Sequence, residues 1–251
     1  MSQTVPYGAS DKHDAVRTMF GRIAHRYDVA NRLMTLGMDG LWRRWTAEAA
    51  KVPPGGLALD VGTGTGDLAF TLAEGEADAR VIGLDYTGEM VALAPGKARE
   101  RGLDARTGFT RGDGHRLPFA DETFDAVTSA WVLRNFADVG AAMAEMARVT
   151  KPGGRVVALE MSPVELPLWR DVFELYMGKI VPILGGFVTG DSGAYEYLPE
   201  SARAFLTPKA VAGVMREAGL TPLPHRAIMG GGLVLHTGVK PAPLPEGTAA
   251  L

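Results

Sequence analysis

Residues 57–67 read LALDVGTGTGD, an apolar run that ends at Asp60 and continues into three glycines at alternate positions. The amphipathic stretch LAFTLAEG follows from residue 68. A buried strand that turns through glycines into a helix leaves backbone N–H groups open to a ligand, because glycine has no Cβ. This order predicts a nucleotide-type binding turn that includes Gly62, Gly64 and Gly66.

The spacing of the glycines distinguishes between possible ligands. A dinucleotide fingerprint needs its third glycine three positions after the second, where this chain has Asp67. A Walker loop needs Gly-Lys-Ser/Thr, which does not follow the turn. Asp60 disfavours a pyrophosphate, whereas it favours a ligand that carries a sulfonium and an ammonium group. The turn therefore favours S-adenosylmethionine (SAM) over NAD or ATP.

Composition and charge narrow the function further. The 251 residues fit one α/β domain with an insertion, and the net charge of −3 provides no basic surface for a nucleic-acid backbone. The absence of cysteine excludes disulfides, thiolate metal sites and a cysteine nucleophile, and the five histidines are scattered, so we expect no metal. We see no signal peptide, and the apolar residues 180–188 are too few to cross a bilayer, which needs roughly 20. We expect a cytoplasmic protein.

Alternating strand and helix patterns predict a doubly wound, mostly parallel α/β sheet of seven strands. The expected strands end near Asp85, Asp113, Ala130 and Met161, and two antiparallel strands follow residue 224. A helix over residues 89–101 should break at Pro95 and Gly96. We expect a single domain over residues 14–240, with mobile tails over 1–13 and 241–251. Within this domain we expect a helical cap at 14–50 and a helical insertion at 162–205.

Polar side chains follow three of these strands, at the sheet edge where open α/β folds bind ligands. Asp85 is placed to accept both ribose hydroxyls of the cofactor, or alternatively to cap a helix. Asp113 is placed to accept from the adenine amino group, or to form an Asx turn with Gly114. Arg134 and Asn135 lie in the loop after the fourth strand, where such folds carry their chemistry.

Three further segments resemble the quinone-biosynthesis C-methyltransferases, the demethylmenaquinone and ubiquinone methyltransferase family. They are YDVANRLMTLGMDGLWRR from residue 27, LRNFAD from residue 133 and YEYLPESARAF from residue 195, and the resemblance runs from residue 16 to residue 240. It implies a Rossmann-like class I SAM-dependent methyltransferase fold, with the cap and insertion over the cofactor. The SAM contacts that it implies, together with those of the glycine turn, are Asp60, Gly62, Thr65, Gly66, Asp85, Asp113 and Gly114.

The resemblance also implies a reaction: C-methylation of a polyprenylated hydroquinone, such as demethylmenaquinol in menaquinone biosynthesis. Alternatives are a 2-polyprenyl-6-methoxy-1,4-benzoquinol, methylation of oxygen or nitrogen in another small molecule, a non-catalytic SAM-binding module and a nicotinamide oxidoreductase. Arg134 and Asn135 would meet the ring oxygens, with Arg134 stabilising a phenolate, unless it forms an ion pair within the fold.

The cap is expected to complete the site through Tyr27 and Asp28, although Tyr27 could instead be a packing anchor. Candidate bases are Asp28, His25, Tyr195 and solvent. Because a polyprenyl chain partitions into lipid, we expect transient membrane-surface contact through residues 180–187, at the inner face of the membrane. A homodimer is a further expectation, and a nucleic-acid partner is not expected.

Overall fold

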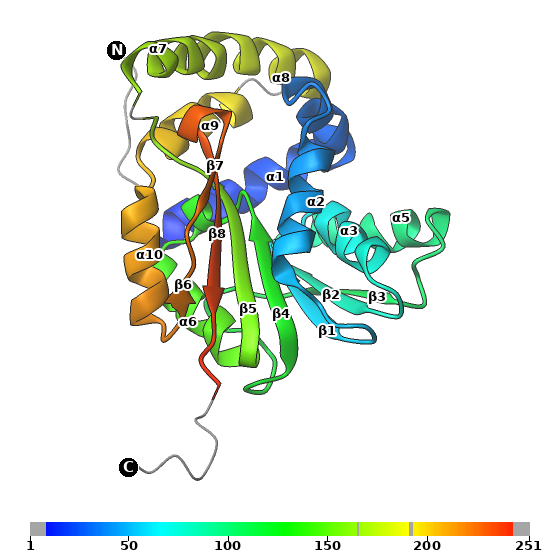
Figure 1. Ribbon diagram of the computed structural model, residues 1–251. Coiled ribbons are helices and arrows are strands. Elements are labelled where there is room, and N and C mark those ends of the chain that lie inside the picture. The colour runs from blue at the N-terminus through cyan, green and yellow to red at the C-terminus, as the bar shows by residue number, and fades with distance from the viewer. Residues whose placement is uncertain (1–8, 165, 191–192, 243–251) are drawn as a thin grey trace, which may run out of the picture.

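The computed structural model describes residues 9–164, 166–190 and 193–242, and these form an eight-stranded sheet flanked by helices (Figure 1). The strand order is β3-β2-β1-β4-β5-β8-β6, and β7 also pairs with β8. The strands are β1 (Leu57–Val61), β2 (Arg80–Asp85), β3 (Thr107–Arg111), β4 (Phe124–Ala130), β5 (Thr150–Met161), β6 (Thr221–Pro222), β7 (Arg226–Ile228) and β8 (Leu233–Val239). The first five are mutually parallel, and β8 is antiparallel to β5.

The outermost strand accounts for the difference between seven expected strands and eight. Thr221 pairs with Val239, and Arg226 pairs with Leu235, so β6 and β7 lie against successive stretches of β8. Together they form one interrupted strand, with the intervening residues leaving the ladder. The sheet therefore has the expected seven strand positions, and the short β6 was missed because two residues carry no alternating pattern.

Helices cover both faces of the sheet. The first face carries α2 (Asp39–Ala50) and α3 (Asp67–Gly75), and the other carries α6 (Val139–Val149) and α10 (Pro208–Glu217). The helix expected over residues 89–101 is divided into α4 (Gly88–Val91) and α5 (Ala94–Glu100), with Pro95 in the first turn of α5. This confirms the predicted break, because proline is tolerated at a helix start but not in its interior.

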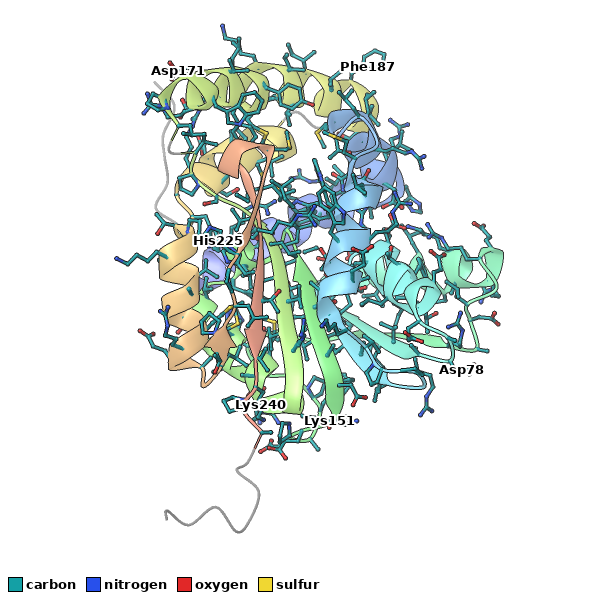
Figure 2. The ribbon with its side chains drawn as sticks, in the orientation of Figure 1. Asp78, Lys151, Asp171, Phe187, His225 and Lys240 are labelled. Atoms are coloured by element: carbon teal, nitrogen blue, oxygen red, sulfur yellow. The ribbon has the colours of Figure 1, made fainter. Side chains whose placement is uncertain are left out.

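The cap and the insertion meet above the carboxyl ends of the parallel strands (Figure 1). The cap consists of α1 (Ala9–Met34) and α2, and the insertion contains α7 (Pro167–Leu175), the π-turn η2 (Tyr176–Ile180), α8 (Val181–Thr189) and α9 (Gly193–Arg203). Arg26 donates to the Val188 carbonyl at 3.1 Å, and the Tyr176 hydroxyl donates to the Met34 carbonyl. Figure 2 shows Asp171 and Phe187 on the outer side of the α7–α8 run.

The start of α1 corrects the expected N-terminal tail. Residues 9–13 belong to the helix, since the stretch from Ala9 to Phe20 contains neither glycine nor proline to end it. Residues 1–8 and 243–251, which make up most of both expected tails, lie outside the described residues.

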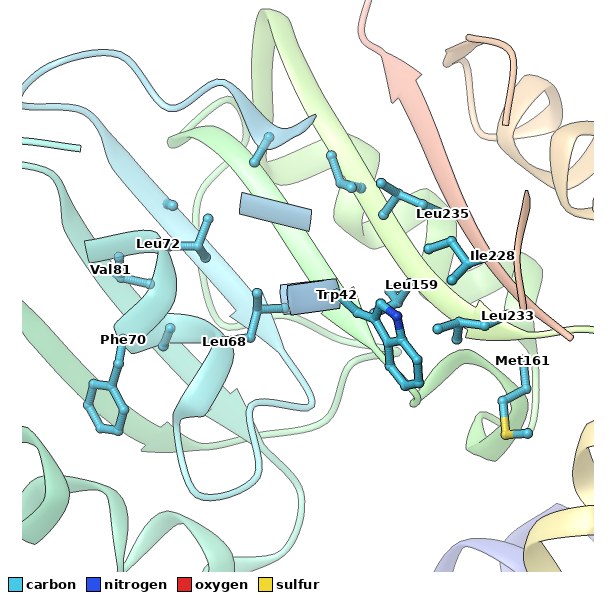
Figure 3. Packing of buried hydrophobic residues seen from close by; sticks show 14 of the residues in the cluster. Trp42, Leu68, Phe70, Leu72, Val81, Leu159, Met161, Ile228, Leu233 and Leu235 are labelled. Carbon is cyan, nitrogen blue, oxygen red and sulfur yellow. The ribbon is translucent and has the colours of Figure 1, made fainter. Parts of the chain in front are cut away.

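Packing on the α2 face fixes the cap to the sheet. Trp42 of α2 is 4% exposed and packs among Leu159 of β5 and Leu233 of β8 (Figure 3). An indole buried in this way contributes apolar area that a solvated helix could not. The cap is therefore part of the hydrophobic core, and its inner face is held at a defined position over the strand ends.

Candidate active site

The glycine turn after β1 has three glycines with positive φ, and each has a different neighbour. A Cβ on Gly62 (φ 72°) would lie 2.4 Å from a methyl group of Val132, and one on Gly66 (φ 95°) would lie 2.9 Å from the Phe70 and Phe109 rings. At Gly64 (φ 55°) no heavy atom lies within 4 Å of that position. Gly62 and Gly66 therefore permit close packing, while Gly64 leaves the space beside its Cα open to a ligand.

A cavity of about 1000 Å³, open mouth included, lies beside this turn. Four of its five charged lining residues are acidic, the fifth being Arg43, and its apolar walls combine aromatic and aliphatic side chains. The acidic residues are Asp28, Asp60, Asp67 and Asp85, and the aromatic residues are Phe20, Tyr27, Tyr86, Trp131 and Phe136. Carboxylates with aromatic walls suit a cationic adenosyl compound and would repel phosphates, so the residues present fit SAM. We call this space the cofactor cavity. Gly62, Thr65 and Gly114 also line it, whereas Gly66 does not.

Asp85 stands at the carboxyl end of β2, facing the cofactor cavity. Its two carboxylate oxygens accept from the backbone N–H groups of Gly64 and Thr87, both at 2.8 Å. Burial raises the pKa of Asp85, and these backbone donors counteract that rise. The N-cap of α4 is Thr87, so the helix-cap alternative does not describe Asp85. The carboxylate fixes the glycine turn and lines the cofactor cavity, and its contact with the ribose hydroxyls stays a prediction.

Asp60 is the most buried acid of the cofactor cavity. It accepts from the Thr63 hydroxyl at 2.7 Å and from the Thr128 hydroxyl at 2.9 Å. Burial raises the pKa of Asp60 to about 7, against the lowering effect of these two hydroxyl donors. A bound cation would lower that pKa again, because an opposite charge favours the ionised form.

Asp28 of α1 reaches the glycine turn through Lys97 of α5. The Lys97 ammonium donates to the carboxylates of Asp28 and Asp67, at 2.7 Å each, and lies 2.9 Å from the Thr65 hydroxyl. The Thr65 hydroxyl in turn donates to Asp28 at 2.7 Å. Burial opposes ionisation of Asp67, but the charges of Lys97, Arg43 and Arg101, with the hydrogen bond from Lys97, together outweigh it and lower the pKa of Asp67. Both Asp28 oxygens are engaged, one of them by an ammonium, so Asp28 ties the cap to the turn and is not placed as a general base.

Asp113 is not among the residues that line the cofactor cavity, and its expected contact with the adenine amino group stays a prediction. Its carboxylate accepts from the His115 backbone N–H at 2.9 Å and lies 2.8 Å from the His115 ring nitrogen. This is the Asx-turn alternative, in which a short acid bonds to its own backbone two residues on. Gly112 and Gly114 line the cavity at this loop. A Cβ on Gly114 would lie 2.6 Å from the Phe136 ring, which explains why this position is glycine.

A second, larger cavity of about 1430 Å³ lies between the cap and the insertion. Its walls are mainly apolar side chains of α1, α2, α7, η2 and β8, including Ile23, Met34, Phe173, Met177 and Leu233. We call it the apolar cavity. Four residues line both cavities: Phe20, Tyr27, Arg43 and Trp131. These four side chains form the partition between the two spaces.

Arg134 and Asn135, expected together at the ring oxygens, face different cavities. Arg134 lines the apolar cavity, and its guanidinium pairs at 2.5 Å with Glu160, whose side chain is fully buried in β5. The backbone N–H of Arg134 also donates to Glu160 at 3.2 Å. A buried carboxylate needs such a counter-ion, so the ion-pair alternative for Arg134 is confirmed. Asn135 lines the cofactor cavity and donates to the Trp131 carbonyl at 3.4 Å.

The other candidate bases are poorly placed. Burial raises the pKa of Tyr27, with the charges of Arg134 and Arg43 opposing the rise, so the phenol stays protonated at neutral pH. His25 is exposed and lines neither cavity. The Tyr195 side chain lies outside the described residues. Of the bases expected from the sequence, solvent is the one that the described geometry favours.

Several polar residues of the site were missed by the sequence reasoning. Glu160 could have been found, because a single acid inside the apolar strand VVALEM implies a buried partner. Asp39 and Arg43 are four residues apart on one helix, a spacing that predicts an ion pair. Lys97 had no distinguishing signal among the surface lysines. Within the described part of the chain, no group of three or more His, Asp or Glu side chains is arranged to hold a metal ion.

The glycine turn, the acid at the end of β2 and the acid-lined cavity at the strand ends define a class I SAM-dependent methyltransferase, and SAM is its cofactor. The fold matches the SpnF [4+2]-cyclase (22% identity, 81% of each chain, TM-score 0.64) and a SAM-dependent methyltransferase from Thermotoga maritima (19% identity, 90% of this chain and 99% of that chain, TM-score 0.61). Because one of these is named as a cyclase, the fold does not fix the reaction.

The chain belongs to the ubiE/COQ5 methyltransferase family, which matches residues 8–240. It is 41% identical to the demethylmenaquinone methyltransferase of Roseiflexus sp. (strain RS-1), over 96% of this chain and 99% of that protein. The enzyme of that name from Deinococcus radiodurans is 46% identical, over 83% and 86% of the two chains. A ubiquinone/menaquinone biosynthesis C-methyltransferase of Geobacter sp. (strain M21) is 37% identical, over 93% and 100%. The resemblance noted in the sequence is therefore confirmed.

The raised pKa of Asp60 predicts a pH dependence of SAM binding. Below pH about 7 the free protein holds a proton on Asp60, which a cationic ligand must displace, so affinity should rise about tenfold from about pH 6 to about pH 8. Calorimetric titration of Asp60→Asn should give a flat dependence. Asp113→Asn, at an acid outside the cavity, serves as the control and should follow the wild type. An unchanged pH dependence in Asp60→Asn would refute the assignment.

Proposed function

We propose that this enzyme transfers the methyl group of SAM to a ring carbon of a polyprenylated hydroquinone, with demethylmenaquinol as its preferred substrate. The observation that carries the proposal is the pair of cavities that meet at one partition. One cavity is acidic and suits a cationic cofactor, and the other is apolar and suits a ring with a hydrocarbon chain. Relatives named demethylmenaquinone methyltransferase, at 41% and 46% identity, support the naphthoquinol ring.

The apolar cavity supports a long hydrocarbon substrate by its position. Its walls come from α1 and the α7–α8 run, with Met161 of β5 and Leu233 of β8 on the sheet side, so it lies between the sheet, the cap and the insertion. Burial of an isoprenoid chain there is favourable by about 0.8 kcal/mol per CH₂ group. The ring would then lie at the partition, with the chain leading outward between the cap and the insertion.

The chemistry needs alignment and a charged acceptor ring. SAM supplies a sulfonium methyl group: the ring carbon forms the new C–C bond, the S–CH₃ bond breaks, and sulfur keeps the electron pair. Phe20, Tyr27 and Trp131 narrow the partition and exclude water from the reacting carbon. The ring hydrogen leaves as a proton to solvent, which restores the aromatic hydroquinone.

A mass-spectrometric assay tests the proposed reaction. Purified enzyme, SAM and demethylmenaquinol kept reduced should give a product heavier by one methyl group, and the oxidised quinone should give none, because only the hydroquinone can ionise to a nucleophilic ring. A polyprenyl benzoquinol, run in parallel, tests the ubiquinone alternative.

The same assay separates the remaining candidates. Methylation of a hydroxyl oxygen in place of a ring carbon would assign an O-methyltransferase. SAM binding in calorimetry without turnover of either quinol would reject the proposed reaction and favour a SAM-binding module.

We also propose that the enzyme collects its substrate at a membrane surface. The insertion exposes Leu166, Val172, Leu175, Ile180, Ile183 and Phe187, and the neighbouring α1 and its following turn expose Val29, Leu33, Leu36 and Met38. We call these ten residues the apolar rim. Ile183 is 70% and Phe187 87% exposed, and the hydrogen bond from Arg26 to Val188 holds the two parts of the rim side by side. Exposed apolar side chains gathered on two neighbouring elements favour an interaction site.

The geometry favours contact along the membrane surface over insertion across it. The helical stretch Trp169–Thr189 is long and apolar enough to span a bilayer by length and composition. Phe173, Met177 and Val181 of this stretch are nevertheless buried against the fold, and all three line the apolar cavity. A spanning position would remove this wall, whereas an interfacial helix keeps it and faces the lipid with its outer side.

Flotation with phosphatidylcholine vesicles tests this contact. The wild type should float with the vesicles, and the double variant Ile183→Asp, Phe187→Asp should float about tenfold less, because two exposed apolar side chains that would enter the lipid are replaced by charges. Leu223→Asp, at an exposed leucine outside the rim, is the matched control and should float normally. No flotation of the wild type, together with a dimer that the double variant dissociates, would assign the rim to a second copy.

A further inference from the structure

We propose that Arg43 binds the ionised hydroxyl of the acceptor ring and holds it as a phenolate at the partition between the two cavities. This role rests on the proposed function, since it concerns the same reaction. It belongs to a residue that the sequence reasoning had left among the arginines of the cap, and it replaces the direct role expected of Arg134.

The position of Arg43 is the first ground. It extends from α2, its side chain is 10% exposed, and it lines both cavities. Of the four partition residues it alone is cationic, since the others are Phe20, Tyr27 and Trp131. A ring that presents a carbon to the cofactor cavity must place its oxygens next to these four side chains.

The hydrogen bonding of Arg43 is the second ground. Its Nη1 donates to Asp39, and its guanidinium carbon lies 5.1 Å from the centre of the Trp131 ring. Asp39 in turn accepts from the Thr35 hydroxyl at 3.0 Å, so the pair is held in place. Among the described residues, Nε and Nη2 of Arg43 have no hydrogen-bond partner. A guanidinium has five donors, and those left are available to an oxyanion.

The contrast with Arg134 is the third ground. The Arg134 guanidinium pairs with a carboxylate that has no exposure to either solvent or cavity mouth, so its charge is compensated inside the fold. Both arginine charges act to lower the pKa of Tyr27, and the Arg43 charge also acts to lower the pKa of Asp60 and of Asp67, although burial leaves the pKa of Tyr27 and of Asp60 raised. Arg43 is thus electrostatically coupled to the cofactor cavity while its free donors remain at the ring position.

The chemical consequence follows from the pKa of arginine. A guanidinium stays protonated in proteins, with a pKa above about 12, so Arg43 acts as a fixed charge and not as a base. The hydroxyl proton leaves to solvent, and the phenolate oxygen accepts from Arg43. The electron density of the phenolate then raises the nucleophilicity of the neighbouring ring carbon, which attacks the sulfonium methyl as balanced above.

A bound naphthol reports directly on this charge. 1-Naphthol changes its absorption spectrum on ionisation and resembles the acceptor ring, so its pKa can be titrated in the protein saturated with S-adenosylhomocysteine. We expect the wild type to lower the naphthol pKa below its value in water, and Arg43→Met to raise it by about two units relative to the wild type. Arg44→Met removes the same charge from an exposed position of the same helix and should behave as the wild type.

Turnover provides a second readout. Arg43→Met should reduce kcat for the quinol about 100-fold, which is the usual effect of removing one oxyanion donor from an enzyme. Arg43→Lys keeps the positive charge and should retain part of the wild-type kcat. Arg44→Met should leave kcat unchanged. A naphthol pKa in the wild type at or above that in water, or an unchanged kcat in Arg43→Met, would overturn the role of Arg43. The first of these needs no variant, so it decides even if Arg43→Met does not fold.

The two proposals fail in different ways. If the wild type methylates the quinol but does not lower the naphthol pKa, the role of Arg43 is wrong and the proposed function stands. If naphthol ionises readily beside Arg43 but no quinol is methylated, the oxyanion site stands and the proposed reaction is wrong.

Discussion

The ammonium group of Lys97 joins the three parts of the chain that make up the site. It lies within 3 Å of Asp28 on the cap, of Asp67 at the start of α3 and of Thr65 in the glycine turn. Each of these groups is partly buried, so the pairing is less screened than one on the surface. Without it, Asp28 and Asp67 would repel each other at the mouth of the cofactor cavity. Together with the apolar packing of α1 and its hydrogen bonds to the insertion, this charge holds α1 over the strand ends, and with it the partition that α1 helps to form.

The separation of an acidic cavity from an apolar cavity explains how the sheet, the cap and the insertion are arranged around the site. The parallel sheet brings Asp60 and Asp85 to one edge and surrounds them with glycines, which produces a site for a cation. Above it, the cap and the insertion contribute apolar side chains to a separate space. A methyl group must pass from the first space to the second, so the reacting atoms have to meet at the four residues common to both. The cap therefore serves both ligands, because Tyr27 and Arg43 belong to it.

The sequence predicted those features that follow from local patterns. Glycine spacing, strand-end acids and a proline inside a helix pattern led to the correct sheet, the correct cofactor and the break between α4 and α5. Asp113 and Arg134 each have a polar partner that the local pattern did not indicate: Asp113 bonds to His115 two residues on, and Arg134 pairs with Glu160, which is 26 residues away in the sequence. Tertiary packing determines which of two available partners a charged side chain contacts. The periodicity of the sequence contains no information about that packing.

The central claim is that cofactor and acceptor ring occupy separate cavities and meet at Phe20, Tyr27, Arg43 and Trp131. A crystal structure of the protein with S-adenosylhomocysteine and menaquinone tests it most directly. The account predicts the adenosyl group beside Gly64 and Asp85, the quinone ring at the partition with one oxygen in hydrogen-bond distance of Arg43, and the isoprenoid chain between α1 and the α7–α8 run. A ring bound away from the partition, or a chain that leaves by the mouth of the cofactor cavity, would contradict it.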